Sequence, residues 1–77
     1  MKAYHFVNDE DSFEIVYSST DLSLIQECIC DSFIVDLWYE FDNMLDCMEP
    51  AEAAKDAWDV TMDWYNNFIY ITESEFI

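Results

Sequence analysis

A row of acidic side chains in the second half of the chain is the feature best suited to chemistry. Its five members are separated by three, four, three and four residues: Glu49, Glu52, Asp56, Asp59 and Asp63. On an α-helix this spacing confines them to an arc of about 80°. Like charges four residues apart destabilise a helix by about 0.2–0.5 kcal/mol per pair, and only Lys55 offers local relief. Such a row therefore indicates a surface that binds cationic groups.

The opposite side of the same segment is apolar. It carries Ala51, Ala54, Trp58, Met62 and Tyr65. We expect this face to pack into the core, and we expect the acidic row to face solvent. Proline is tolerated in the first turn of a helix, so the helix is predicted to begin at Pro50 and to end near Asn66 and Asn67.

A second, shorter acidic row is predicted on the preceding segment. It comprises Asp36 and Glu40 together with Asn43, and Asp42 and Asp46 flank it. The longer row would place five charges over roughly 21 Å, or about one per 4–5 Å, at 1.5 Å per helical residue. A DNA strand carries a phosphate about every 3.4 Å. Two such rows side by side would imitate the phosphates on either side of a groove.

The overall charge points the same way. Eighteen acidic residues stand against two lysines, arginine is absent, and the net charge is −16. This balance excludes nucleic acids and anionic membranes as direct partners and favours a strongly basic protein surface. Glycine is also absent, which rules out glycine-rich phosphate-binding loops. With 53% hydrophobic residues, the 77-residue chain is expected to form one folded domain rather than a disordered one.

Catalytic and metal-binding patterns are weak. His5 is the only histidine and lies in a predicted strand with no nucleophile near it in sequence, so a structural role is expected. Cys28, Cys30 and Cys47 lack the paired spacing of a zinc site, and two buried thiols and one exposed thiol are expected. We predict no enzymatic activity, no cofactor and no metal.

The aromatic residues are interleaved with acids rather than with lysine and arginine, as they would be in a nucleic-acid-binding protein. Trp38 and Trp58 are expected to lie in the core. Tyr39 and Trp64 fall outside the main apolar arcs and are the better candidates for contacting a partner.

The remaining pattern predicts an α+β fold. Lys2–Val7 and Ser12–Ser18 suit an N-terminal antiparallel β-hairpin, and Phe68–Thr72 suits a C-terminal strand that completes the sheet. Two or three helices are expected between them. The first begins after a cap among Ser19, Thr20 and Asp21, or with a capping box of Ser23 and Gln26.

The interior of this helical region leaves alternatives open. Asp31 and Ser32 interrupt the apolar pattern and indicate a break, after which a helix is predicted from Phe33 to Met48. Residues 33–39 also nearly alternate between apolar and polar, so a strand there is the alternative.

In size, charge and helix-borne acidic rows, the chain resembles the small DNA-mimic inhibitors of phages and mobile elements, of the anti-CRISPR and anti-restriction type. The resemblance implies a basic target such as a CRISPR effector or restriction enzyme, in the cytoplasm of a host bacterial cell, bound by a monomer or homodimer. An immunity or antitoxin protein against a basic nuclease toxin is the alternative, and an acidic adaptor for basic protein tails is a third. No apolar run long enough for a signal peptide or a membrane span is present, in keeping with a cytoplasmic location.

Overall fold

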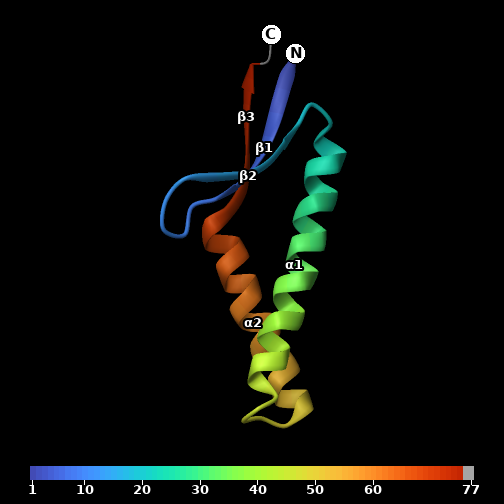
Figure 1. Cartoon of the computed structure of the whole chain (residues 1–77), viewed down its shortest axis with the longest axis vertical. Coiled ribbons are helices and arrows are strands. Elements are labelled where there is room, and N and C mark those ends of the chain that lie inside the picture. Colours follow the sequence, from blue (N-terminus) through green and yellow to red (C-terminus); the bar gives the residue numbers. More distant parts are fainter. Residues whose placement is uncertain (76–77) are drawn as a thin grey trace.

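The chain forms a small antiparallel sheet at one end and a helical hairpin whose first helix starts beside the sheet and runs to the other end (Figure 1). The computed structural model describes residues 1–75. Within that range the order of elements is β1 (Lys2–Asn8), β2 (Glu14–Ser19), α1 (Leu22–Met44), α2 (Pro50–Phe68) and β3 (Ile69–Glu75). The predicted α+β class is therefore confirmed.

The sheet has the strand order β2-β1-β3, with both neighbours antiparallel to β1. The predicted N-terminal hairpin and the C-terminal strand that completes the sheet are thus confirmed. Beyond the predicted Thr72, strand β3 continues to Glu75, opposite Lys2, so residues 73–75 extend the strand rather than fray, while Phe76 and Ile77 lie outside the described residues. A register shift occurs between Phe6 and Val7, and these two side chains are the best-buried part of the sheet.

Helix α1 is a single element, so the expected break at Asp31 and Ser32 is wrong. The strand alternative for residues 33–39 is wrong as well. The hydroxyl group of Ser32 does not cap a new helix but lies 2.8 Å from the hydroxyl oxygen of Tyr65 on α2. Packing against α2 therefore accommodates a polar pair, although the local pattern alone indicated an interruption.

The start of α1 is fixed by Asp21, one of the predicted caps. Its carboxylate accepts hydrogen bonds from the hydroxyl and the backbone N–H of Ser23, at 2.7 Å and 3.0 Å. These bonds, the side-chain one foremost, lower the pKa of Asp21. The helix ends at Met44 rather than at the predicted Met48, because a short turn leads into Glu49. Glu49 is extended, as a residue before proline should be, and Pro50 occupies the first turn of α2 as predicted.

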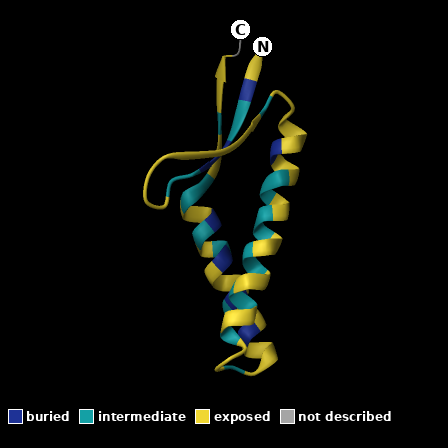
Figure 2. Ribbon diagram, viewed as in Figure 1, coloured by how far each residue is buried: buried dark blue, intermediate teal, exposed yellow. Residues whose placement is uncertain are grey.

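The buried side of α2 is a narrow stripe of three small residues and one tyrosine. Every fourth residue of α2 is buried: Ala53, Ala57, Thr61 and Tyr65. In Figure 2 these positions follow the side of α2 that meets α1. The expected core face of α2 is therefore wrong except at Tyr65, since Ala51, Ala54 and Trp58 are exposed and Met62 is half-buried. Small residues allow close approach to α1, which leaves the bulkier Trp58 at the margin.

The molecule is long and thin. Its principal extents are 52 × 23 × 14 Å, and its radius of gyration is 14.9 Å, against about 11–12 Å expected for a compact 77-residue domain. Helix α1 packs against α2 and, near its start, against the sheet, yet Ile25 is its only buried residue. Much apolar surface stays exposed as a result, notably on α1 and on strand β2.

Candidate functional site

The acidic row of α2 lies on one side of an unbroken helix. Glu49, Glu52, Asp59 and Asp63 are exposed, and Asp56 is half-buried. Because α2 is regular from Pro50 to Phe68, the spacing of Glu52, Asp56, Asp59 and Asp63 keeps their carboxylates on one stripe, away from the buried one. Glu49 precedes them at the N-cap of the helix. Lys55 is exposed and forms no ion pair within residues 1–75. The row is thus free to pair with external cations.

Two acids of α1 and its following turn extend this charge. Asp42 and Asp46 are exposed near the end of the helical hairpin, where the chain turns from α1 into α2. Glu49 begins α2 at the same end (Figure 1). The tip of the hairpin is therefore strongly negative.

Asp36 and Glu40 do not form the predicted second outer row. Both are half-buried rather than exposed. The carboxylate of Asp36 accepts a hydrogen bond of 2.5 Å from the hydroxyl group of Tyr65, across the interface between the helices. The predicted groove between two exposed acidic rows is therefore wrong, and one row remains, on α2, with the acids of the hairpin tip continuing it.

Burial, and secondly the hydrogen bond to Asp36, raise the pKa of Tyr65 to about 12. Tyr65 is only 9% exposed and packs edge-on against Phe33, with ring centroids 5.1 Å apart. Phe33 makes a similar contact with Trp58, at 5.4 Å. The role of Asp36 is therefore structural, because its carboxylate accepts the hydrogen bond of a buried phenol.

The two predicted aromatic contact residues differ in placement. Tyr39 is 65% exposed, as expected of a residue outside the apolar arc. Trp64 is half-buried rather than exposed, and its Nε1 atom is buried without a hydrogen-bond partner among the described residues. Its ring borders a hollow beside the β1–β2 turn, which makes Trp64 a poorer contact residue than the sequence suggests.

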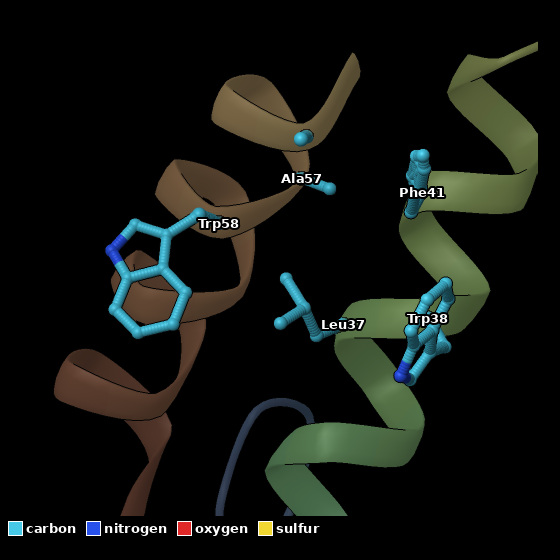
Figure 3. Close-up of a pocket in the computed structure, with 6 residues that line it drawn as sticks. Leu37, Trp38, Phe41, Ala57 and Trp58 are labelled. Carbon is cyan, nitrogen blue, oxygen red and sulfur yellow. The ribbon is translucent and has the colours of Figure 1, made fainter. Parts of the chain in front are cut away.

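The sequence did not reveal an apolar groove between the two helices. It has a volume of about 350 Å³ and is lined by Leu37, Trp38, Phe41, Ala54, Ala57 and Trp58. In Figure 3 Leu37 projects from α1 toward α2, between the two indole rings. Trp38 is 61% exposed and Trp58 is 50% exposed, so the expectation that both lie in the core is wrong. The signal for this groove was available, because apolar residues occur all around α1 and a single partner helix cannot cover them.

His5 and the cysteines have simple surroundings. The two ring nitrogens of His5 lie 2.6 Å and 2.9 Å from the hydroxyl oxygens of Ser18 and Ser74, so the ring bridges the three strands. Cys28 is half-buried, while Cys30 and Cys47 are exposed, which corrects the expected two buried thiols. Within the part of the chain that the structure describes, no three histidine, cysteine or acidic side chains gather in a way that would hold a metal ion.

Among residues 1–75, no helix combines the length and apolar character needed to cross a membrane. Comparison of the chain with protein-family models, curated proteins and solved structures found no match. The function must therefore be inferred from the geometry and charge of this molecule alone.

Proposed function

We propose that the protein is an inhibitor that acts as a DNA mimic. Its acidic surface would occupy the basic nucleic-acid-binding channel of a host defence nuclease, such as a CRISPR effector or a restriction enzyme, in the bacterial cytoplasm. The observation that carries the proposal is the α2 row from Glu49 to Asp63, with four carboxylates on one rigid helix and a fifth at its N-cap, none of them with an ion-pair partner among the described residues.

The mechanism is competition for cationic side chains. Arginine and lysine residues that hold phosphates form charge-assisted hydrogen bonds equally well with carboxylates. The spacing of the row, roughly 5 Å between neighbouring charges along the helix axis, is close enough to that of phosphates to engage several such residues at once. A net charge of −16 would also steer the encounter, so association should be fast at low salt and slower as salt is added. Inhibition by this route needs no cofactor and no catalytic residue.

The α2 row and the hairpin tip carry the proposed contacts. They comprise Asp42, Asp46, Glu49, Glu52, Asp56, Asp59 and Asp63. Tyr39 adds an exposed aromatic ring on α1. Asp36 is left out of this set because its carboxylate accepts the hydrogen bond of Tyr65, and Glu40 because it is half-buried on α1, apart from the acidic stripe of α2.

An immunity or antitoxin role against a basic nuclease toxin is the second candidate. The continuous row of acids along one helix and its adjoining turn favours it, because a single acidic helix suits a compact nuclease cleft as well as a long DNA channel. The chemistry of binding is the same and only the partner differs.

Affinity capture tests the proposal. The purified protein is immobilised and exposed to a bacterial lysate treated with nuclease, and bound proteins are identified by mass spectrometry. We expect a basic nucleic-acid-binding protein that is released by duplex DNA and by salt. Capture of a small nuclease toxin would favour the immunity role, and captured proteins that lack a basic nucleic-acid site would contradict both.

A further inference from the structure

The apolar groove belongs to a larger uncovered face of the helical hairpin, here called the groove face. Its α1 side consists of Ile34, Leu37, Trp38, Phe41 and Leu45, and its α2 side of Ala51, Ala54 and Trp58. The spacings of three and four residues place each set on one stripe of its helix. Ile34 is 51% exposed, and both indole rings are at least half exposed. A continuous apolar face of this kind in a water-soluble chain marks an interaction surface.

The distribution of charge says what kind of occupant suits this face. None of its eight residues is acidic. On α2 it lies about 150° around the helix from the acidic row, at 100° per residue. Asp31 and Asp42 lie only at its α1 margin. A basic partner would find few carboxylates on the groove face to pair with. An equally apolar surface could instead cover the groove face without coming close to the acidic row of α2.

The dimensions of the chain point to a missing layer. Its accessible surface is 5429 Å², against about 4,900 Å² expected for a folded monomer of 9.2 kDa. The excess is about 500 Å² per chain, or about 1,000 Å² for two chains, which is about the smallest area for which a biological interface is argued. Together with the large radius of gyration, this indicates that one chain is less than the complete folded unit.

We propose that a second copy of this chain covers the groove face in a two-fold symmetric dimer. In a two-fold contact the same patch meets itself, so the groove of each copy receives apolar side chains of the other. A cavity of about 150 Å³ admits a benzene ring, so the groove of about 350 Å³ has room for an indole ring. The result is a four-helix layer with the two α2 acidic rows on its outer surfaces. The dimer follows from apolar surface and holds whether or not the DNA-mimic function does.

Sedimentation equilibrium over a dilution series tests the dimer directly. We expect the wild-type protein to sediment at twice the 9.2 kDa of one chain and to dissociate on dilution. Added salt should strengthen the dimer, because it screens the repulsion between two highly acidic chains. Binding to a basic target should instead weaken with salt, so failure of one idea is distinguishable from failure of the other.

A matched pair of variants locates the interface. Ala54→Glu adds a carboxylate inside the groove, and Val60→Glu adds the same charge at an exposed position of α2 outside the groove face. Burial of an unpaired charge should raise the dimer dissociation constant of Ala54→Glu by about 100-fold or more, and Val60→Glu should change it little. Trp58→Ala, which removes an indole ring without adding charge, should also weaken the dimer; far-UV circular dichroism checks that each variant folds.

Two results would overturn the proposal. One is a wild-type protein that sediments as a single chain at every concentration, in which case the groove face awaits a different occupant. The other is a dimer that folded Ala54→Glu and Trp58→Ala variants leave as strong as Val60→Glu does.

Discussion

The hydroxyl group of Tyr65 on α2 donates a hydrogen bond of 2.5 Å to the carboxylate of Asp36 on α1. The Ser32 hydroxyl lies 2.8 Å from the same phenolic oxygen, so the three polar groups form one network across the helix interface. This contact joins two helices that also meet through the edge-on contacts of Phe33 with Trp58 and Tyr65 and through the small buried residues of α2. It also withdraws Asp36 from the acidic surface that a partner would contact.

The network should contribute measurably to stability. Tyr65→Phe removes the donor and leaves the half-buried Asp36 carboxylate without it, so we expect a loss of about 1–3 kcal/mol in the free energy of unfolding. Asp36→Asn keeps an acceptor for the phenol and should cost less. Urea unfolding at a fixed protein concentration measures both, and Tyr39→Phe, at an exposed ring, serves as the control. Equal stability of Tyr65→Phe and Tyr39→Phe would show that the network contributes nothing.

The raised pKa of Tyr65 gives a pH dependence with a definite sign. The folded state holds the phenolic proton up to a pKa of about 12, whereas the unfolded chain releases it near the ordinary value of 10.0. The folded state therefore binds more protons in this window, and the stability that the phenol contributes is complete below pH 10 and lost as the pH rises toward 12. Thermal melts from about pH 9 to 12 should show this decline in the wild-type protein. The Tyr65→Phe variant should lack the part of the decline that comes from ionisation of this phenol. Parallel declines in the two proteins would show that Tyr65 does not cause the loss of stability.

Salt should stabilise the isolated protein. The described residues contain only two ion pairs, both exposed, between Lys2 and Glu73 and between the N-terminal amine and Glu75. Repulsion among eighteen acids therefore dominates the electrostatics, and screening reduces it. We expect the midpoint of thermal unfolding to rise as sodium chloride is added at constant protein concentration. A midpoint that falls would mean that attractive pairs outweigh the repulsion.

The sequence predicted those parts of the fold that depend on local chemistry. Proline at position 50 set the start of α2, and the spacing of the acids set their common stripe. The partner of Asp36 was beyond prediction, because Tyr65 lies 29 residues away and only the packing of the helices brings them together. The same applies to Ser32, whose local pattern resembled a helix break.

The tryptophans illustrate a second limit. The spacing of apolar residues identified an apolar face at Trp58. It did not show whether another element of the same chain packs against that face. In the structure the small residues Ala53, Ala57 and Thr61 take the interface with α1, which leaves the two indole rings exposed. Which of two adjacent stripes is buried depends on how closely the helices approach, and sequence spacing does not encode that distance.

Charge reversal on α2 should separate a specific row from general acidity. Asp56→Lys and Asp59→Lys place cations within the row, whereas Glu75→Lys makes the same change on β3, at the far end of the molecule (Figure 1). We expect the first two variants to weaken binding to the captured target much more than the third, because each opposes the cations that the row would contact. Binding is measured by surface plasmon resonance at several salt concentrations. Equal losses in all three variants would argue that only net charge matters.

The most direct test asks whether the protein and DNA exclude each other from the target. The captured basic protein is mixed with fluorescent duplex DNA and increasing amounts of the inhibitor, and the bound species are followed by fluorescence-detected sedimentation. Mimicry predicts that DNA is displaced and that the apparent affinity of the inhibitor falls in proportion to the DNA present. A ternary complex in which both bind with undiminished affinity would contradict it.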